Sequence, residues 1–227
     1  MIREQRFSGT GTAREPGSAN FALLRRLATM GVAGPLLFVV GIVVGGAVTP
    51  GYSHLSDPVS QLAATGQPYP FIQMTGFVLF GLAIVATGLG LWRLPLTGRA
   101  ARTGQVLLII AGTSMVLTGL FRADPMQQES LTTSGTLHLI TAMVLFLSVS
   151  AAFLFCARAF RRANGWGDRS RFSLVAGLAA IAFLLTYSVA FELQPEMVGL
   201  WQRLFAATIV TWFVVVASRL RGMMDGT

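Results

Sequence analysis

The sequence predicts an all-α integral membrane protein, built as a bundle of six transmembrane helices. Hydrophobic residues make up 53% of the 227 residues and charged residues only 11%, whereas about a quarter of the residues in a soluble domain are charged. The apolar residues fall in blocks that are each close to the roughly 20 residues a helix needs to cross a bilayer. These blocks cover residues 30–49, 71–92, 103–121, 134–157, 172–191 and 199–218. A transmembrane barrel would instead show short segments of alternating hydrophobicity.

The placement of arginine predicts which ends of these helices face the cytoplasm. All 17 basic residues are arginines, and all except Arg122 and Arg203 lie in the N-terminal tail, in the connections after the second and fourth blocks, or near the C-terminus. Cytoplasmic loops of membrane proteins carry an excess of basic residues. We therefore expect a cytoplasmic (inner) membrane protein with both termini in the cytoplasm. The net charge of +8 then reflects topology and attraction to anionic lipid headgroups, and nucleic-acid binding is not expected.

The domain boundaries follow from composition. Residues 1–22 are rich in Gly, Ser, Thr and charge, which predicts a disordered cytoplasmic tail. Residues 23–221 are expected to form one six-helix domain, and residues 222–227 a C-terminal tail. The first block follows a long polar segment and exceeds the length of a signal-peptide core, so no cleavage is expected. Cys156 is the only cysteine, which excludes an internal disulfide and a multi-cysteine metal site.

Small residues are frequent within the predicted helices. Gly41 and Gly45 in GIVVG have the spacing that allows two membrane helices to approach closely. This pair either packs within the bundle or forms a homodimer face, and packing within the bundle is the favoured interpretation.

Polar side chains gather at the helix ends opposite the arginine-rich connections. Asp124, in GLFRADP, comes where the third helix ends, and His138 lies about one turn into the fourth. Because the two residues are expected at the same membrane level, we predict a hydrogen bond between the Asp124 carboxylate and the His138 imidazole. Such a pair either only ties two helix ends together or provides an oriented general acid or base.

The stretch TPGYSHLSDPVSQLAAT, residues 49–65, supplies a second group of polar side chains at the same ends. Its Pro-Gly pair ends the first helix. Ser56 or Asp57 before Pro58 predicts the N-cap of a short helix that lies at the outer surface or dips into it. The Asp57 carboxylate is either only this cap or points across the mouth of the bundle toward Asp124 and His138.

Two further residues enter the last predicted helix from the same side. They are Gln202 and Arg203, in GLWQRLF. An arginine at that depth needs an anionic partner, which is either Asp57 or Asp124, or a lipid phosphate. We expect the salt bridge within the protein, because an intramembrane charge is usually paired inside the bundle.

Together these motifs resemble an uncharacterised family of bacterial and archaeal six-span membrane proteins, domain of unknown function 998 (DUF998). The resemblance covers about residues 30–220, and it implies a membrane fold but no activity. Family members often have Pro in the third-span motif where this chain has Arg122 and Ala123. By position, the family pattern falls on Ser56, Asp57, Ser60, Asp124, His138, Gln202 and Arg203.

Three functions remain open from the sequence. The first is an enzyme that acts on a lipid or isoprenoid at the outer leaflet, with membrane lipids as its partners and no cofactor. Its candidate catalytic residues are Asp124, His138 and Asp57. Its candidate substrate-binding residues are Ser56, Ser60, Gln202 and Arg203. The possible nucleophiles are the serines Ser56, Ser60 and Ser134. The second is a non-catalytic protein that binds a lipid or isoprenoid, acts as a sensor or stabilises a partner. The third, a small-molecule transporter, is disfavoured because no acid or histidine lies at the middle of a span.

A metal-dependent enzyme is disfavoured as well. The available ligands would be His54, His138, Asp57 and Asp124. They include no pair at the close spacing typical of metal-binding motifs, so no metal is expected.

Overall fold

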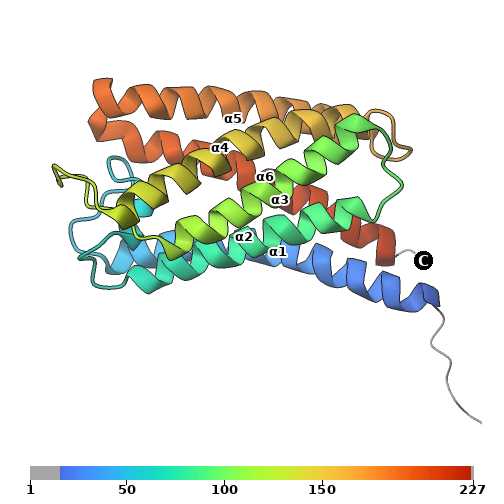
Figure 1. Ribbon diagram of the computed structural model, residues 1–227, viewed down its shortest axis with the longest axis horizontal. Helices are drawn as coiled ribbons and strands as arrows, with labels where there is room; N and C mark the ends of the chain where they lie inside the picture. Colours follow the sequence, from blue (N-terminus) through green and yellow to red (C-terminus); the bar gives the residue numbers. More distant parts are fainter. Residues whose placement is uncertain (1–15, 226–227) are drawn as a thin grey trace, which may run out of the picture.

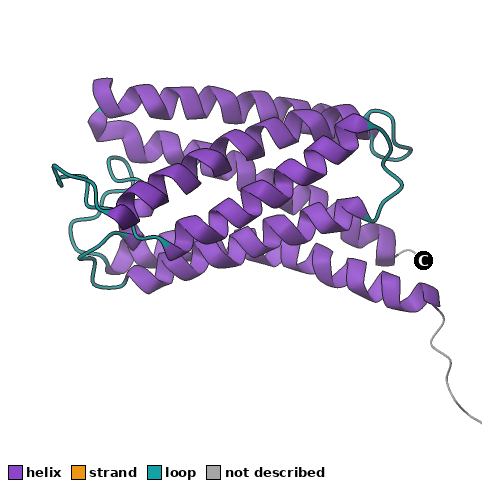
Figure 2. Ribbon diagram, viewed as in Figure 1, coloured by secondary structure: helices purple, strands orange, loops and turns teal. Residues whose placement is uncertain are grey.

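The computed structural model describes residues 16–225, and its six long helices confirm the predicted fold class (Figures 1 and 2). The helices are α1 (Pro16–Val48), α2 (Pro70–Trp92), α3 (Arg99–Leu120), α4 (Thr133–Phe160), α5 (Gly167–Leu193) and α6 (Val198–Asp225). Two short 3₁₀ helices, η1 (Val59–Ala63) and η2 (Pro195–Met197), accompany them, and the described residues contain no strand. Each predicted block falls on one helix, and all six helices are long and apolar enough to cross a membrane.

The first and last helices are longer than the sequence pattern predicts. Helix α1 begins at Pro16, inside the predicted tail, and α6 continues to Asp225. Proline is well tolerated in the first helical turn, where its missing N–H costs no hydrogen bond, and the Ala, Leu and Arg residues that follow are strong helix formers. The rest of the predicted N-terminal tail, residues 1–15, lies outside the described residues.

The six helices form a ring in which each helix packs on the next one in sequence and α6 packs back on α1. Glycines allow the closest approaches. A methyl group added at Gly112 on α3 would lie 2.6 Å from the carbonyl oxygen of Gly81 on α2, so these two backbones are in direct contact. Gly41 faces the side chain of Gln73 and Gly45 faces Leu62, so the GIVVG glycines are used for packing within the bundle.

The connections divide the bundle into two ends. The arginine-rich end carries the connections 93–98 and 161–166, the start of α1 and the end of α6. The opposite end, here called the loop end, carries residues 49–69, 121–132 and 194–197 and lies at the left of Figure 1. Val59, Leu62 and Ala63 of η1 are buried there, so this short helix dips into the bundle, as one of the two sequence-based alternatives proposed.

Backbone hydrogen bonds hold the 49–69 segment to both sides of the loop end. The amide of Thr65 donates to the carbonyl of Ala123 at 3.0 Å, and the amide of Leu200 donates to the carbonyl of Leu55 at 2.9 Å. The segment therefore bridges the α3–α4 connection and the start of α6.

An aromatic cluster fills the middle of the bundle. Phe153 on α4 stacks on Trp212 of α6 with ring centroids 4.3 Å apart, and the indole N–H of Trp212 donates to Ser173 Oγ of α5 at 2.9 Å. Phe80 on α2 meets Phe213 on α6 edge to face. These contacts hold α4, α5 and α6 together away from the loop end, where α4 and α5 diverge from each other (Figure 1).

Candidate functional site

A cavity of about 670 Å³ lies inside the loop-end half of the bundle and is lined by residues of all six helices, of η1 and of the α3–α4 connection. Its volume is within the range of about 300–1,000 Å³ that is typical of small-molecule sites. Most of its wall is apolar. The apolar lining includes Phe77, Phe80, Ile84, Met115, Leu145, Phe146, Leu184, Phe205 and Ile209.

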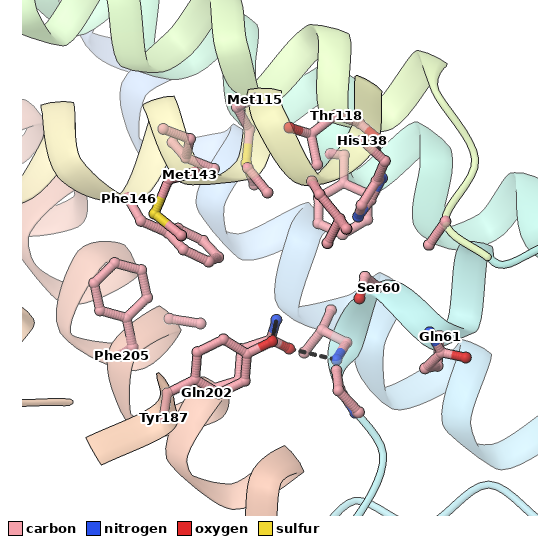
Figure 3. A pocket seen from close by; sticks show the side chains of 18 of the residues that line it. Ser60, Gln61, Met115, Thr118, His138, Met143, Phe146, Tyr187, Gln202 and Phe205 are labelled. Carbon is pink, nitrogen blue, oxygen red and sulfur yellow. Dashed lines mark hydrogen bonds between the residues drawn. The ribbon is translucent and has the colours of Figure 1, made fainter. Parts of the chain in front are cut away.

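The polar lining residues lie toward one end of this cavity. His138 is about one turn into α4, Gln202 about one turn into α6 and Tyr187 near the end of α5, while Ser60 belongs to η1. All four positions are therefore close to the loop end. Figure 3 shows His138, Ser60 and Gln202 around one hollow, with Phe146 and Phe205 on another part of its wall.

The imidazole of His138 is fixed by the end of α3. Its Nδ1 lies 2.9 Å from the carbonyl oxygen of Phe121 and 3.1 Å from that of Thr118, and the side chain is only 3% exposed. Because carbonyl oxygens only accept, the hydrogen is assigned to Nδ1. In the neutral imidazole, Nε2 then carries a lone pair, and it has no hydrogen-bond partner among the described residues.

The Asp124 carboxylate does not hold His138, contrary to the predicted hydrogen bond. It accepts from the backbone N–H of Thr132 at 2.7 Å and from the Thr132 hydroxyl at 2.8 Å. The Thr132 hydroxyl in turn accepts from the N–H of Gly135 as the N-cap of α4. The unpaired N–H groups at the start of α4 attract the carboxylate, so Asp124 stabilises the start of this helix. The imidazole of His138 is held instead by the carbonyl groups at the end of α3.

Gln202 connects three elements at the polar end of the cavity. Its Oε1 accepts from the backbone N–H of Val59 at 2.5 Å, the dashed bond in Figure 3, and its Nε2 donates to the hydroxyl of Tyr187 at 3.2 Å. The side chain is 8% exposed. It thereby joins η1, α5 and α6 next to the hollow.

Asp57 lies away from the cavity, and the predicted N-cap is wrong. The N-cap position of η1 is Pro58, with no side-chain cap hydrogen bond. The Asp57 carboxylate instead accepts from the N–H of Ser53 at 2.7 Å, and the N–H of Asp57 donates to the carbonyl of Ser53 at 2.8 Å. The residue thus closes a tight turn that also contains Ser56, and neither residue lines the cavity.

Arg203 binds backbone and hydroxyl groups, so the predicted salt bridge is wrong. One guanidinium nitrogen donates to the carbonyl of Asp57 at 2.8 Å and to that of Gly199 at 2.9 Å. The other donates to the hydroxyl of Tyr52, whose ring centroid lies 5.5 Å from the guanidinium carbon. Partial negative charges on these oxygens stabilise the cation without a carboxylate. Burial outweighs the nearby Arg203 charge and raises the pKa of Tyr52 to about 12.

The remaining candidate residues from the sequence make contacts within the connections at the loop end. Ser134 Oγ accepts from the N–H of Arg122 at 2.8 Å and donates to its carbonyl at 3.0 Å, and it does not line the cavity. His54 packs edge to face on Tyr52 in the exposed part of the 49–69 segment. Within residues 16–225, no group of three His, Cys, Asp or Glu side chains is placed to hold a metal ion.

One side of the cavity wall faces outward. Leu139 and Met143 of α4 and Phe191 of α5 line the cavity while being 53%, 51% and 41% exposed. These residues lie on the two helices that diverge toward the loop end. The cavity lining therefore extends to the exposed surface of α4 and α5, which would face lipid in a membrane.

Sequence reasoning missed two residues of this region. Tyr187 carries a hydroxyl inside an apolar span, one turn before Phe191, and that unusual polarity is the signal that could have identified it. Gln61 lies in the quoted 49–65 stretch. Its Nε2 donates to the carbonyl of Asp124 at 3.0 Å and its Oε1 accepts from the N–H of Met126 at 3.2 Å, which fastens η1 to the α3–α4 connection.

Comparison with known proteins adds a family but no activity. No curated protein and no solved structure matches the chain. The family described as "Protein of unknown function (DUF998)" matches residues 32–219, which include α2 to α5 and η1 in full, parts of α1 and α6, and every residue of the polar end. The chain therefore belongs to the DUF998 family.

Proposed function

We propose that this protein binds a membrane amphiphile, a single-chain lipid or an isoprenoid, in the cavity at the loop end of the bundle. The observation that carries the proposal is the combination of an apolar cavity of about 670 Å³ with an exposed apolar side and a buried polar end. An amphiphile has the same division between an apolar chain and a polar group.

The direction of the cavity matches the orientation of a lipid in one leaflet. Its polar residues lie near the helix ends, and its apolar wall continues toward the middle of the bundle, as far as Ile84 and Ile209. From Gln202 to Ile209 the α6 wall rises about 10 Å at ~1.5 Å per residue. A lipid that entered between α4 and α5 would keep its polar group at the membrane surface and its chain at hydrocarbon depth.

The geometry supports binding better than catalysis. A general base is usually oriented by a partner that also stabilises its protonated form, but the Asp124 carboxylate bonds to Thr132 instead of His138. Of the candidate nucleophiles, Ser134 is bonded to the backbone of Arg122 and Ser56 lies outside the cavity. Ser60 lines the cavity, but within the described residues its hydroxyl has no hydrogen bond to a base. Recognition of a polar group needs only the free Nε2 of His138 and the neighbouring hydroxyl and amide groups.

The test is to identify the lipids that copurify with the full-length protein by mass spectrometry. Ala142→Trp fills the cavity from α4, and Leu147→Trp, on the same helix but 57% exposed and outside the cavity, is the matched control. We expect a single-chain lipid or isoprenoid in the wild type and the control, with at least about tenfold less in Ala142→Trp, equivalent to ~1.4 kcal/mol. Equal retention by both tryptophan variants contradicts the proposal.

We further propose that the protein lies in the cytoplasmic membrane with its arginine-rich end in the cytoplasm. The distribution of arginine supports this orientation through the positive-inside rule. Glu129→Cys marks the loop end and Thr97→Cys the arginine-rich end; both positions are exposed, while the native Cys156 is buried. A membrane-impermeant maleimide should label Glu129→Cys in intact cells and Thr97→Cys only after permeabilisation. The reverse labelling pattern would show that the protein has the opposite orientation in the membrane.

A further inference from the structure

The polar end of the cavity contains no cationic side chain. Among the residues described as lining it, the only formally charged group is the carboxylate of Asp124. The two arginines at the loop end bind elsewhere: Arg203 donates to Asp57, Gly199 and Tyr52, and Arg122 donates to the carbonyl of Ala64. A phosphate group in this cavity would meet a negative charge and no arginine, and burying a charge without a partner is costly.

The hydrogen-bonding groups that remain free select a different chemistry. The Nε2 of His138 accepts, because the Nδ1 hydrogen is directed at the carbonyls of Phe121 and Thr118. The hydroxyl of Tyr187 accepts from Gln202, and its own hydrogen has no acceptor among the described residues. A ligand that suits both groups must offer a hydrogen to His138 and an oxygen to Tyr187.

A hydroxyl group is the simplest function that offers both. The hydroxyl of Ser60, which makes no hydrogen bond within the described residues, adds a third neutral group on the same hollow (Figure 3). We propose that the ligand is an uncharged amphiphile with a free hydroxyl, such as an isoprenoid alcohol or a monoacylglycerol, and that its phosphorylated counterpart is excluded. This inference rests on the proposed function of the same cavity.

The experiment compares two matched pairs of probes on the purified full-length protein in nanodiscs. Farnesol and farnesyl phosphate share one chain, and 1-oleoylglycerol and 1-oleoyl lysophosphatidate share another. We expect at least one alcohol to bind about tenfold or more tightly than its phosphate, measured with radiolabelled probes. Whichever pair binds identifies the chain class. Tighter binding of the phosphates overturns the inference but leaves the proposed cavity function intact, whereas no binding of any of the four probes overturns both.

Two variants connect the preference to the residues. Ser60→Ala removes a hydroxyl that has no partner within the described residues, so we expect this variant to fold normally. The substitution should weaken binding of the alcohol about threefold to tenfold. His138→Ala should weaken it about tenfold or more, and His54→Ala, at the other histidine, is the matched control with unchanged binding. Unchanged alcohol affinity in Ser60→Ala and in folded His138→Ala contradicts the assigned contacts.

Discussion

Asp124 and Thr132 form a paired contact in which both carboxylate oxygens accept from one residue, at 2.7 Å from its backbone nitrogen and 2.8 Å from its hydroxyl. The contact fixes the α3–α4 connection on the start of α4. Gly135, the third residue of α4, lies so close to the carboxylate that any side chain at this position would overlap with it. The position of α4, and with it His138, therefore depends on this contact.

Replacing Asp124 by alanine should lower the stability of the protein more than it changes the chemistry of the cavity. The N–H and the hydroxyl of Thr132 would both lose their charged acceptor in this partly buried contact, which costs about 1–3 kcal/mol in free energy of unfolding. Thermal unfolding in detergent measures the loss. Glu129→Gln, on the exposed part of the same connection, is the control and should unfold like the wild type. An Asp124→Ala variant as stable as the control would show that the contact contributes nothing.

Replacing Gln202 by leucine should detach η1 from α6. Leucine has a similar size but accepts nothing from the N–H of Val59 and donates nothing to Tyr187. We expect a loss of about 1–3 kcal/mol in stability and faster reaction of a cysteine introduced at Ser60 with a thiol reagent. Gln127→Leu, at an exposed glutamine of the α3–α4 connection that does not line the cavity, serves as control. An unchanged rate at residue 60 argues against this role of Gln202.

The Tyr52 hydroxyl should make stability fall at alkaline pH. Its pKa is raised from 10.0 to about 12, chiefly by burial, so the folded protein retains the proton after the unfolded chain has lost it. Stability from this group is therefore complete below pH 10 and declines as the pH rises toward 12. Unfolding of the wild type and of Tyr52→Phe, compared from pH 8 to pH 12, should show a steeper decline in the wild type. Parallel curves would contradict the assignment.

Replacing Gly112 by alanine should destabilise the bundle, because the added methyl group would lie 2.6 Å from the carbonyl oxygen of Gly81. Such overpacking typically costs about 1–3 kcal/mol. Gly222→Ala, in an exposed part of α6 with no atom near the added methyl group, should instead stabilise its helix by about 0.5–1 kcal/mol. The two variants thus shift the unfolding temperature in opposite directions. A stabilised Gly112→Ala would show that α2 and α3 do not cross in contact.

The extent to which the sequence predicted this protein differs between its helices and its site. Six apolar blocks specify six helices, because a bilayer admits few other structures. Grouping polar residues by membrane side also found His138, Gln202 and Ser60, all of which line the cavity. Helix ends, however, offer many unpaired backbone groups that compete for each side chain.

That competition explains the wrong pairings. Arg203 bonds to backbone oxygens and Asp57 to a backbone N–H, although their opposite charges suggested a salt bridge. The cavity itself was not predictable, because it depends on the divergence of α4 from α5. That divergence depends on contacts between residues far apart in sequence, such as Phe153 and Trp212, which no local sequence pattern encodes.

The bonds of the 49–69 segment also constrain the order in which the protein can be assembled. Val59 is joined to Gln202 across 143 residues of chain, and Leu55 to Leu200 beside it. During synthesis, η1 leaves the ribosome long before α6 exists. The loop end of the cavity can therefore close only after the last helix has inserted, and a chain truncated before α6 would leave the amide of Val59 without this acceptor.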